Sequence, residues 1–216
     1  MSRGDRVLVT GGAGFIGSAL VWALNTRGIA AVVIADRLGT TDKWRNLAPL
    51  RFEDYLEADD LFPRLESGSL GEFSLVLHMG ACSSTLERDA SYLARNNFEF
   101  TKTLARWSLA NEVRFVYASS AATYGDGAAG LYNVGSGEAH TWLDLAHALF
   151  AAMGREPQIE FIEMPEAMRG RYQYYTRADI SRLRATGYES PTTPLDAAVA
   201  DYVTRYLDPD HRLGDE

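Results

Sequence analysis

A glycine pattern near the N-terminus constrains this chain more than any other feature. An apolar run at residues 7–9 precedes Gly11, Gly14 and Gly17, and apolar residues then recur at helical spacing. This order predicts a strand, a glycine turn and a helix. Such a turn suits a dinucleotide pyrophosphate, because glycine permits tight turning, close approach of phosphate and close helix packing. The N-terminus of the helix adds N–H donors and a positive dipole end.

An acidic residue lies at the position where a dinucleotide-binding site is expected to carry one. A second apolar run, residues 31–35, ends in Asp36, about 20 residues after the glycines, where a carboxylate can bind ribose. Asp36 alone favours NAD, whereas Arg37 and Lys43 in the following polar segment favour the 2′-phosphate of NADP. The alternatives are an ordinary strand–helix turn and a solvated loop whose charges are incidental.

Composition narrows the class of protein. The 216 residues carry a formal net charge of −8, which argues against nucleic acid or an anionic membrane as a general partner. Cys82 is the single cysteine, so an intrachain disulfide is ruled out and a reducing cytoplasm is expected. We expect no bound metal, because His78 and Cys82 lack further ligands nearby; a packed histidine and a small buried cysteine are the better interpretation.

Further apolar runs alternate with helical patterns. We expect strands at residues 52–57, 74–78 and 113–118, and helices at residues 59–66 and 85–110. Strands that alternate with helices indicate a parallel sheet with right-handed crossovers. The fold class is therefore α/β, a Rossmann-like doubly wound parallel sheet of about five strands in the order 3-2-1-4-5.

The chain changes character after a loop at residues 125–130. Strands are expected at residues 131–134 and 159–162. Helices are expected at residues 142–153, with Thr141 as N-cap, and at 178–185 and 195–207. We therefore predict a dinucleotide-binding domain at residues 1–127 and a small α+β substrate domain at residues 128–216.

Several segments together resemble a known superfamily. TGGAGFIG, the strand-end Asp36, HMGACSST, NNFEFT and ASSAATYG resemble the extended short-chain dehydrogenases/reductases. YNVGSG and GRYQYYTRADISRLRATGY are similar, within that superfamily, to the ADP-L-glycero-D-manno-heptose 6-epimerase family. The resemblance covers residues 6–125 and 131 to about 207. It implies a cytoplasmic isomerase that interconverts two ADP-heptoses by NADP-dependent transient oxidation at C6″, in lipopolysaccharide precursor synthesis.

The resemblance also implies roles for individual residues. Phe15 and Ile16, with the glycines, would hold the pyrophosphate, and Ser120 matches the catalytic serine. Tyr172 and the adjacent Arg171 would contact the nucleotide sugar. A further group of residues would line the cofactor: Met79, Gly80, Ala81, Cys82, Ser83 and Asn96.

One part of the superfamily pattern is missing. Its proton-transfer pair is Tyr-x-x-x-Lys, but Lys43 and Lys102 are the only lysines, and neither lies four residues after a tyrosine. The resemblance therefore implies an internal deletion near residues 125–129, an exposed sheet edge and epimerisation that is very slow or absent. A homo-oligomer is compatible with such an exposed edge. The alternatives are a non-catalytic NADP-binding pseudoenzyme, another nucleotide-sugar epimerase or dehydratase, and a chain without a stable fold.

Overall fold

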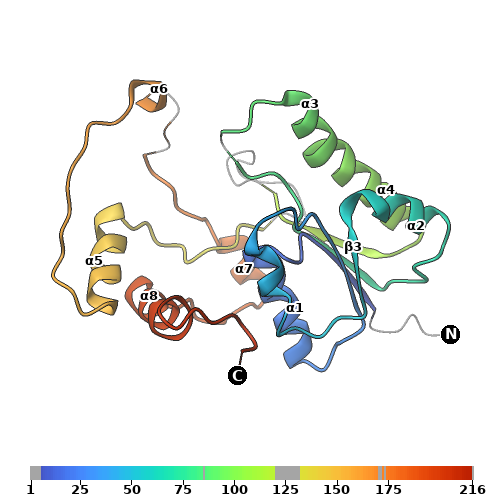
Figure 1. Cartoon of the computed structure of the whole chain (residues 1–216), viewed down its shortest axis with the longest axis horizontal. Helices are drawn as coiled ribbons and strands as arrows, with labels where there is room; N and C mark the ends of the chain where they lie inside the picture. The colour runs from blue at the N-terminus through green and yellow to red at the C-terminus, as the bar shows by residue number, and fades with distance from the viewer. Residues whose placement is uncertain (1–5, 85, 120–131, 170–171, 173, 216) are drawn as a thin grey trace. The chain divides into compact units, whose positions relative to one another are not determined.

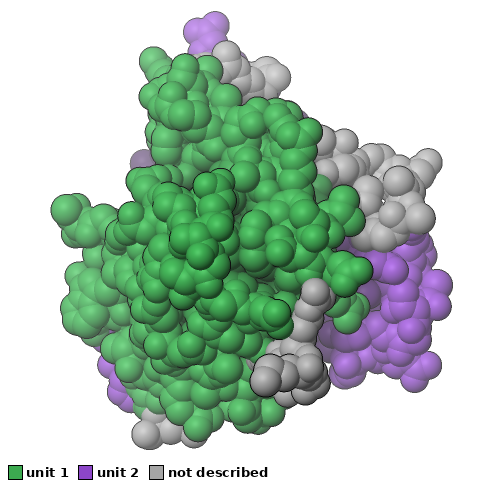
Figure 2. All heavy atoms as spheres, turned by 90° about the vertical axis from the view of Figure 1, so that its right-hand side faces the viewer, with its two compact units in different colours: residues 1–118, 212–216 green, residues 119–211 purple. Residues whose placement is uncertain are grey.

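The computed structural model describes residues 6–84, 86–119, 132–169, 172 and 174–215. The chain divides into two compact units (Figures 1 and 2). One comprises residues 1–118 with 212–216, and the other comprises residues 119–211. The predicted domain boundary at residue 127 lies outside the described residues.

The first unit is built on a parallel sheet of five strands. These are β1 (Val7–Thr10), β2 (Val32–Asp36), β3 (Asp54–Glu57), β4 (Leu75–His78) and β5 (Arg114–Tyr117). Their order is β3-β2-β1-β4-β5, which confirms the order predicted from the sequence. Val7 pairs with Val32 on one side and with Leu75 on the other. The strand order therefore reverses at β1, and ligands of open α/β sheets bind beyond the carboxyl ends of the strands at such a point.

Helices connect successive strands of this sheet (Figure 1). The helices after β1 and β2 are α1 (Phe15–Thr26) and the 3-10 helix η1 (Asp42–Asn46). Those after β3 are the 3-10 helix η2 (Ala58–Asp60) and α2 (Leu61–Glu66). Those after β4 form one continuous stretch of α3 (Ala90–Leu93), the π-helical η3 (Ala94–Glu99) and α4 (Phe100–Ala110).

Alternate residues of the strands feed two separate hydrophobic clusters. Val7, Val9 and Ile34 belong to one cluster, whereas Leu8 and Val33 belong to the other. Successive side chains of a strand point to opposite faces, so this alternation means that both faces of the sheet are covered. The continuous apolar runs that predicted these strands reflect that double burial.

Three apolar residues of α1 and α4 are exposed. Phe15 and Ile16 are 77% and 61% exposed, and α1 instead buries the positions around Gly17 and Val21. Leu109 of α4 is also largely exposed, whereas Leu104 is fully buried. Phe15 and Ile16 occupy the first turn of α1, at its N-terminus.

The second unit contains helices in its described residues. They are α5 (Trp142–Ala152), α6 (Glu166–Arg169), α7 (Ser181–Ala185), α8 (Leu195–Tyr202) and the π-helical η5 (Val203–Leu207). The predicted N-cap is confirmed, because the Thr141 hydroxyl accepts the Asp144 N–H and the Asp144 carboxylate accepts the Thr141 N–H. Helix α5 packs against α8.

The strands predicted at residues 131–134 and 159–162 are absent from the described part of this unit. That prediction was wrong, because a strand forms only where a neighbouring strand accepts its backbone hydrogen bonds. The described residues of the unit offer no such neighbour. The helices in the described part of the chain also lack the length and apolar character that crossing a membrane requires.

Candidate active site

The glycine turn after β1 brings the start of α1 against the strand end. Gly11 has φ of +69°, a region that favours glycine, and its N–H donates to the Ala35 carbonyl at 2.8 Å. A Cβ on Gly17 would stand 2.0 Å from the Gly11 carbonyl oxygen. Side chains do not cap α1, and its first turn carries no acidic residue. The described geometry therefore has the form of an anion site at a helix N-terminus.

Asp36 ties this turn to the segment after β2. Its carboxylate is 7% exposed, and Oδ2 accepts the N–H of Ala13 at 2.8 Å. Oδ1 lies 2.7 Å from the Nζ of Lys43, so the lysine compensates the buried negative charge. Asn46 donates to the Ala13 carbonyl at 2.9 Å. Asp36 and η1 thus hold the same residue of the glycine turn, one at its N–H and the other at its carbonyl.

Arg37, directly after β2, reaches to Asp59 of η2, two residues after the end of β3. Its Nη1 lies 2.5 Å from Oδ2 of Asp59. This hydrogen bond raises the pKa of Arg37 and lowers the pKa of Asp59 from their ordinary values. The Nε of Arg37 is buried and has no hydrogen-bond partner among the described residues. A buried N–H donor without a partner can donate a hydrogen bond to a ligand oxygen.

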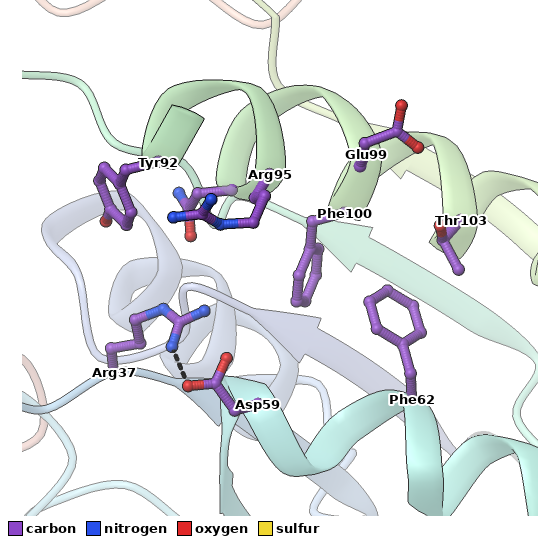
Figure 3. A pocket seen from close by; sticks show the side chains of 9 residues that line it. Arg37, Asp59, Phe62, Tyr92, Arg95, Glu99, Phe100 and Thr103 are labelled. Atoms are coloured by element: carbon purple, nitrogen blue, oxygen red, sulfur yellow. Dashed lines mark hydrogen bonds and ion pairs between the residues drawn. The ribbon is translucent and has the colours of Figure 1, made fainter. Parts of the chain in front are cut away.

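A pocket of about 240 Å³ opens beside this ion pair (Figure 3). The rings of Phe62 and Phe100 lie 4.7 Å apart between their centroids and form an apolar wall. Charged and polar side chains surround this wall. The lining residues are Arg37, Asp59, Phe62, Tyr92, Arg95, Asn96, Glu99, Phe100 and Thr103. An apolar wall with a polar rim suits a flat heterocycle.

Sequence reasoning placed Arg37 and Asn96 at the site but missed the other residues of this pocket. Asp59 carried a usable signal, because it follows directly after the third predicted strand, where ligand-binding residues gather. Phe62 and Phe100 carried no such signal, since an aromatic residue on an amphipathic helix is normally interpreted as part of the hydrophobic core.

The loop after β4 lies against the glycine turn. A Cβ on Gly11 would stand 2.7 Å from the backbone nitrogen of Gly80, so the two backbones are in direct contact. Further along the loop, Asn97 holds the backbone of Cys82 twice. Its Oδ1 accepts the Cys82 N–H at 2.8 Å, and its Nδ2 donates to the Cys82 carbonyl at 2.9 Å. Asn96 donates to the same Oδ1. Asn97 is therefore a further residue that the sequence reasoning missed.

His78 ends β4 beneath this loop and is 3% exposed. Its ring stacks between Phe100 and Phe115, with centroids 5.7 and 6.0 Å away. The interpretation of His78 as a packed core histidine is thus confirmed. Burial lowers the pKa of His78 to about 4.

The remaining predicted residues belong to the second unit or lie outside the description. Ser120 and Arg171 fall among the residues that the structure does not describe. The hydroxyl of Tyr172 accepts the indole N–H of Trp142, and its ring makes an edge contact with Tyr174, 5.1 Å between centroids. Clusters of His, Cys, Asp and Glu that could hold a metal are absent from the described residues.

Comparison with known families decides the relationship. Residues 7–141 match the family model "NAD dependent epimerase/dehydratase family". The chain belongs to this family. The match includes the glycine turn, Asp36, the loop after β4 and all the strands of the sheet.

Among its relatives, this family member is similar to enzymes named ADP-L-glycero-D-manno-heptose-6-epimerase. That of Nitratidesulfovibrio vulgaris (strain Hildenborough) is 32% identical, over 93% of this chain and 97% of the relative. That of Cupriavidus pinatubonensis is 29% identical, over 91% and 97%. A solved enzyme of the same name from Helicobacter pylori aligns with a TM-score of 0.48 and 24% identity, over 59% of this chain and 43% of that one.

The length of the first alignment shows an internal gap. It extends over 314 positions, although this family member has only 216 residues. A long stretch of the relative therefore has no counterpart here, even though the match spans almost the whole of both chains. This agrees with the internal deletion inferred from the missing Tyr-x-x-x-Lys pair.

Replacing Gly17 by alanine should destabilise the first unit. Alanine alone would favour the helix by about 1 kcal/mol. However, the new Cβ would stand 2.0 Å from a backbone oxygen that cannot rotate away. We expect Gly17→Ala to lower the free energy of unfolding by about 1–3 kcal/mol in urea denaturation. Ile16→Ala, one position earlier and exposed, should change it by less than about 0.5 kcal/mol. Equal or greater stability of Gly17→Ala would contradict the described contact.

The burial of His78 should make stability depend on pH. Between its ordinary pKa of 6.5 and its folded pKa of about 4, the unfolded chain binds a proton at His78 that the folded chain does not. Stability is therefore full above pH 6.5 and is lost as the pH falls toward 4, by about 3 kcal/mol. Denaturation across this range should show the slope in the wild type and a weaker one in His78→Asn. His140→Asn, a substitution at a more exposed histidine, should retain the slope. An unchanged slope in His78→Asn would refute this assignment.

Proposed function

We propose that this chain is an ADP-L-glycero-D-manno-heptose 6-epimerase by descent, that it binds NADP, and that its turnover is impaired. The observation that carries the proposal is the alignment with curated enzymes of that name over almost the full length of both chains. The reaction interconverts ADP-D-glycero- and ADP-L-glycero-D-manno-heptose. The single cysteine is in keeping with a cytoplasmic enzyme of lipopolysaccharide precursor synthesis.

The first unit fits a dinucleotide. The absence of a side chain at Gly17 lets the start of α1 lie against Gly11, and the buried Nε of Arg37 is an unsatisfied donor among the described residues. Phe15 and Ile16 flank the open N-terminus of α1, where we place the pyrophosphate. The pocket of Phe62 and Phe100 would take the adenine end. When bound, the nicotinamide accepts and returns a hydride, so no net redox change occurs.

Two cations favour NADP over NAD. Lys43 lies 2.7 Å from the Asp36 carboxylate and neutralises a charge that would repel a 2′-phosphate. Arg37 follows Asp36 and presents a guanidinium at the rim of the pocket. A fork of N–H donors suits phosphate oxygens. We assign the ribose end of the cofactor to Asp36, Arg37 and Lys43. The loop from Met79 to Ser83, with Asn96, would line its remaining length.

The sugar end of the proposed site is incomplete. Ser120 would donate a hydrogen bond to the reacting oxygen, and Arg171 and Tyr172 would contact the diphosphate and the sugar. The tyrosine and lysine that would move the proton are absent from the sequence. A positioned general acid or base supplies about 10²–10⁴-fold in rate. We therefore expect turnover to be reduced by at least that factor.

A second candidate is a non-catalytic NADP-binding protein. The absence of a Tyr-x-x-x-Lys pair from the whole sequence favours it. Such a protein would bind the cofactor as tightly as an active relative but would not turn over ADP-heptose. Another nucleotide-sugar epimerase or dehydratase is less well supported, because the relatives that align over nearly the whole chain carry the heptose epimerase name.

Lys43→Met should shift cofactor preference. It removes a cation and leaves Asp36 uncompensated, so NADPH affinity should fall about tenfold or more while NADH affinity is retained or improved. Titration followed by tryptophan fluorescence measures both affinities. The matched control is Lys102→Met, at the other lysine of the chain, which pairs with Glu99 at 3.0 Å and lies outside the pocket lining. Equal loss of both cofactors, or no loss of NADPH, would contradict the assignment.

The epimerase assay decides between the two candidates. Purified chain and the Nitratidesulfovibrio vulgaris enzyme would be incubated with NADP and ADP-D-glycero-D-manno-heptose, and the two epimers separated by chromatography. Slow but cofactor-dependent conversion supports an impaired epimerase. Saturable NADPH binding without conversion supports the non-catalytic protein. Turnover equal to that of the relative would refute impairment, and conversion only of other nucleotide sugars would refute the substrate.

A further inference from the structure

His78 connects the two loops of the proposed cofactor site through a defined set of hydrogen bonds. Its Nδ1 lies 2.5 Å from the hydroxyl of Thr10, at the end of β1. Its Nε2 lies 2.8 Å from the hydroxyl of Thr101, in α4. The ring thus bridges the strand that leads into the glycine turn and the helix that packs behind the loop after β4.

The direction of each bond follows from the number of protons available. Thr101 has one hydroxyl proton and donates it to the Asn97 carbonyl at 2.7 Å. Its oxygen must therefore accept from Nε2–H of His78. A neutral imidazole then carries no proton on Nδ1, which accepts from Thr10. The oxygen of Thr10 remains an acceptor, and the Gly80 N–H points to it at 3.3 Å.

The network ends on the backbone of one loop at two places. The Thr10 hydroxyl accepts the Gly80 N–H. Thr101 donates to the backbone carbonyl of Asn97, and the side chain of Asn97 bonds both backbone groups of Cys82. Asn97 lies in the π-helical η3, an irregularity that is frequent at functional sites. The segment from Gly80 to Cys82 is therefore held at both ends by hydrogen bonds to Thr10 and Asn97, and His78 connects these two residues.

We propose that His78 is a positioning residue, which holds the Met79–Ser83 loop against the glycine turn in the geometry that binds the dinucleotide. This inference rests on the cofactor site proposed above. Packing alone would be served by an apolar residue at this position, since the ring lies between Phe100 and Phe115. The bonds at Nδ1 and Nε2 instead join Thr10, which accepts the Gly80 N–H, and Thr101, which donates to the carbonyl of Asn97.

Thr10 offers a test that spares the core. Thr10→Val keeps the shape of the side chain but removes the hydroxyl that joins Gly80 to His78, whereas Thr10→Ser keeps the hydroxyl. We expect the NADPH dissociation constant to rise about tenfold in Thr10→Val and to stay within about twofold of the wild type in Thr10→Ser. Titration at a temperature well below the melting transition excludes an effect of unfolding.

Ser108→Ala is the matched control. Ser108 is fully buried in α4, the helix that carries Thr101, and its hydroxyl has no hydrogen-bond partner among the described residues. Removing it should leave NADPH affinity unchanged. Equal weakening in Ser108→Ala and Thr10→Val, or failure of Thr10→Ser to retain affinity, would overturn the positioning role.

Two measurements without cofactor separate this inference from the proposed function. Nitrogen NMR of labelled histidine should show the Nε2–H tautomer of His78; the Nδ1–H tautomer would overturn the inference. Amide hydrogen exchange at Gly80 and Cys82 should accelerate in Thr10→Val and not in Thr10→Ser. Failure of the wild type to bind NADPH would refute the proposed cofactor site, and unaltered exchange in Thr10→Val would refute the positioning role independently.

Discussion

The contact between Gly17 and the Gly11 carbonyl is the constraint on which the rest of the first unit depends. Because position 17 lacks a Cβ, α1 can begin directly against the end of β1; a Cβ there would stand only 2.0 Å from the Gly11 oxygen and overlap it. The backbone of this turn is in direct contact with the loop after β4 at Gly80. A larger residue at either place would separate the turn from that loop. The Gly80 N–H could then not reach the Thr10 hydroxyl, which His78 also contacts.

Much of the first unit could be predicted because the signals for its strands and turns lie within short stretches of the sequence. Strands buried on both faces appear as short continuous apolar runs, and glycine marks the turn that follows the first of them. Those two signals give the order of elements, and right-handed crossovers give the order of strands. Asp36 was predictable for the same reason, since its position follows from the length of one helix and one strand.

The pocket could not be predicted, because it is assembled by tertiary contact. Asp59 and Phe62 come from the segment after β3, and Tyr92 and Phe100 come from the helices after β4. Each residue is ordinary in its own segment, and only the packing of η2 and α2 beside the α3–α4 stretch makes them neighbours. The expected strands of the second unit failed for a related reason. An apolar run of four residues becomes a strand only when a partner exists, and the sequence pattern does not record whether one does.

The internal gap separates two requirements that an epimerase must meet together. Cofactor binding depends on burial, glycine contacts and a compensated carboxylate, and all of these lie within residues 6–118 and one compact unit. Proton transfer depends on groups whose pKa must be tuned by a neighbour, and the sequence holds no tyrosine with a lysine at the required spacing. Under the proposed function, loss of the second set would lower the rate without removing apolar area from either cluster of the sheet. The internal deletion therefore leaves the first unit with both hydrophobic clusters and with the hydrogen bonds of His78 to Thr10 and Thr101. The edge of the sheet at β5 is open, because β5 pairs only with β4 in the described structure and Val116 and Tyr117 are exposed there.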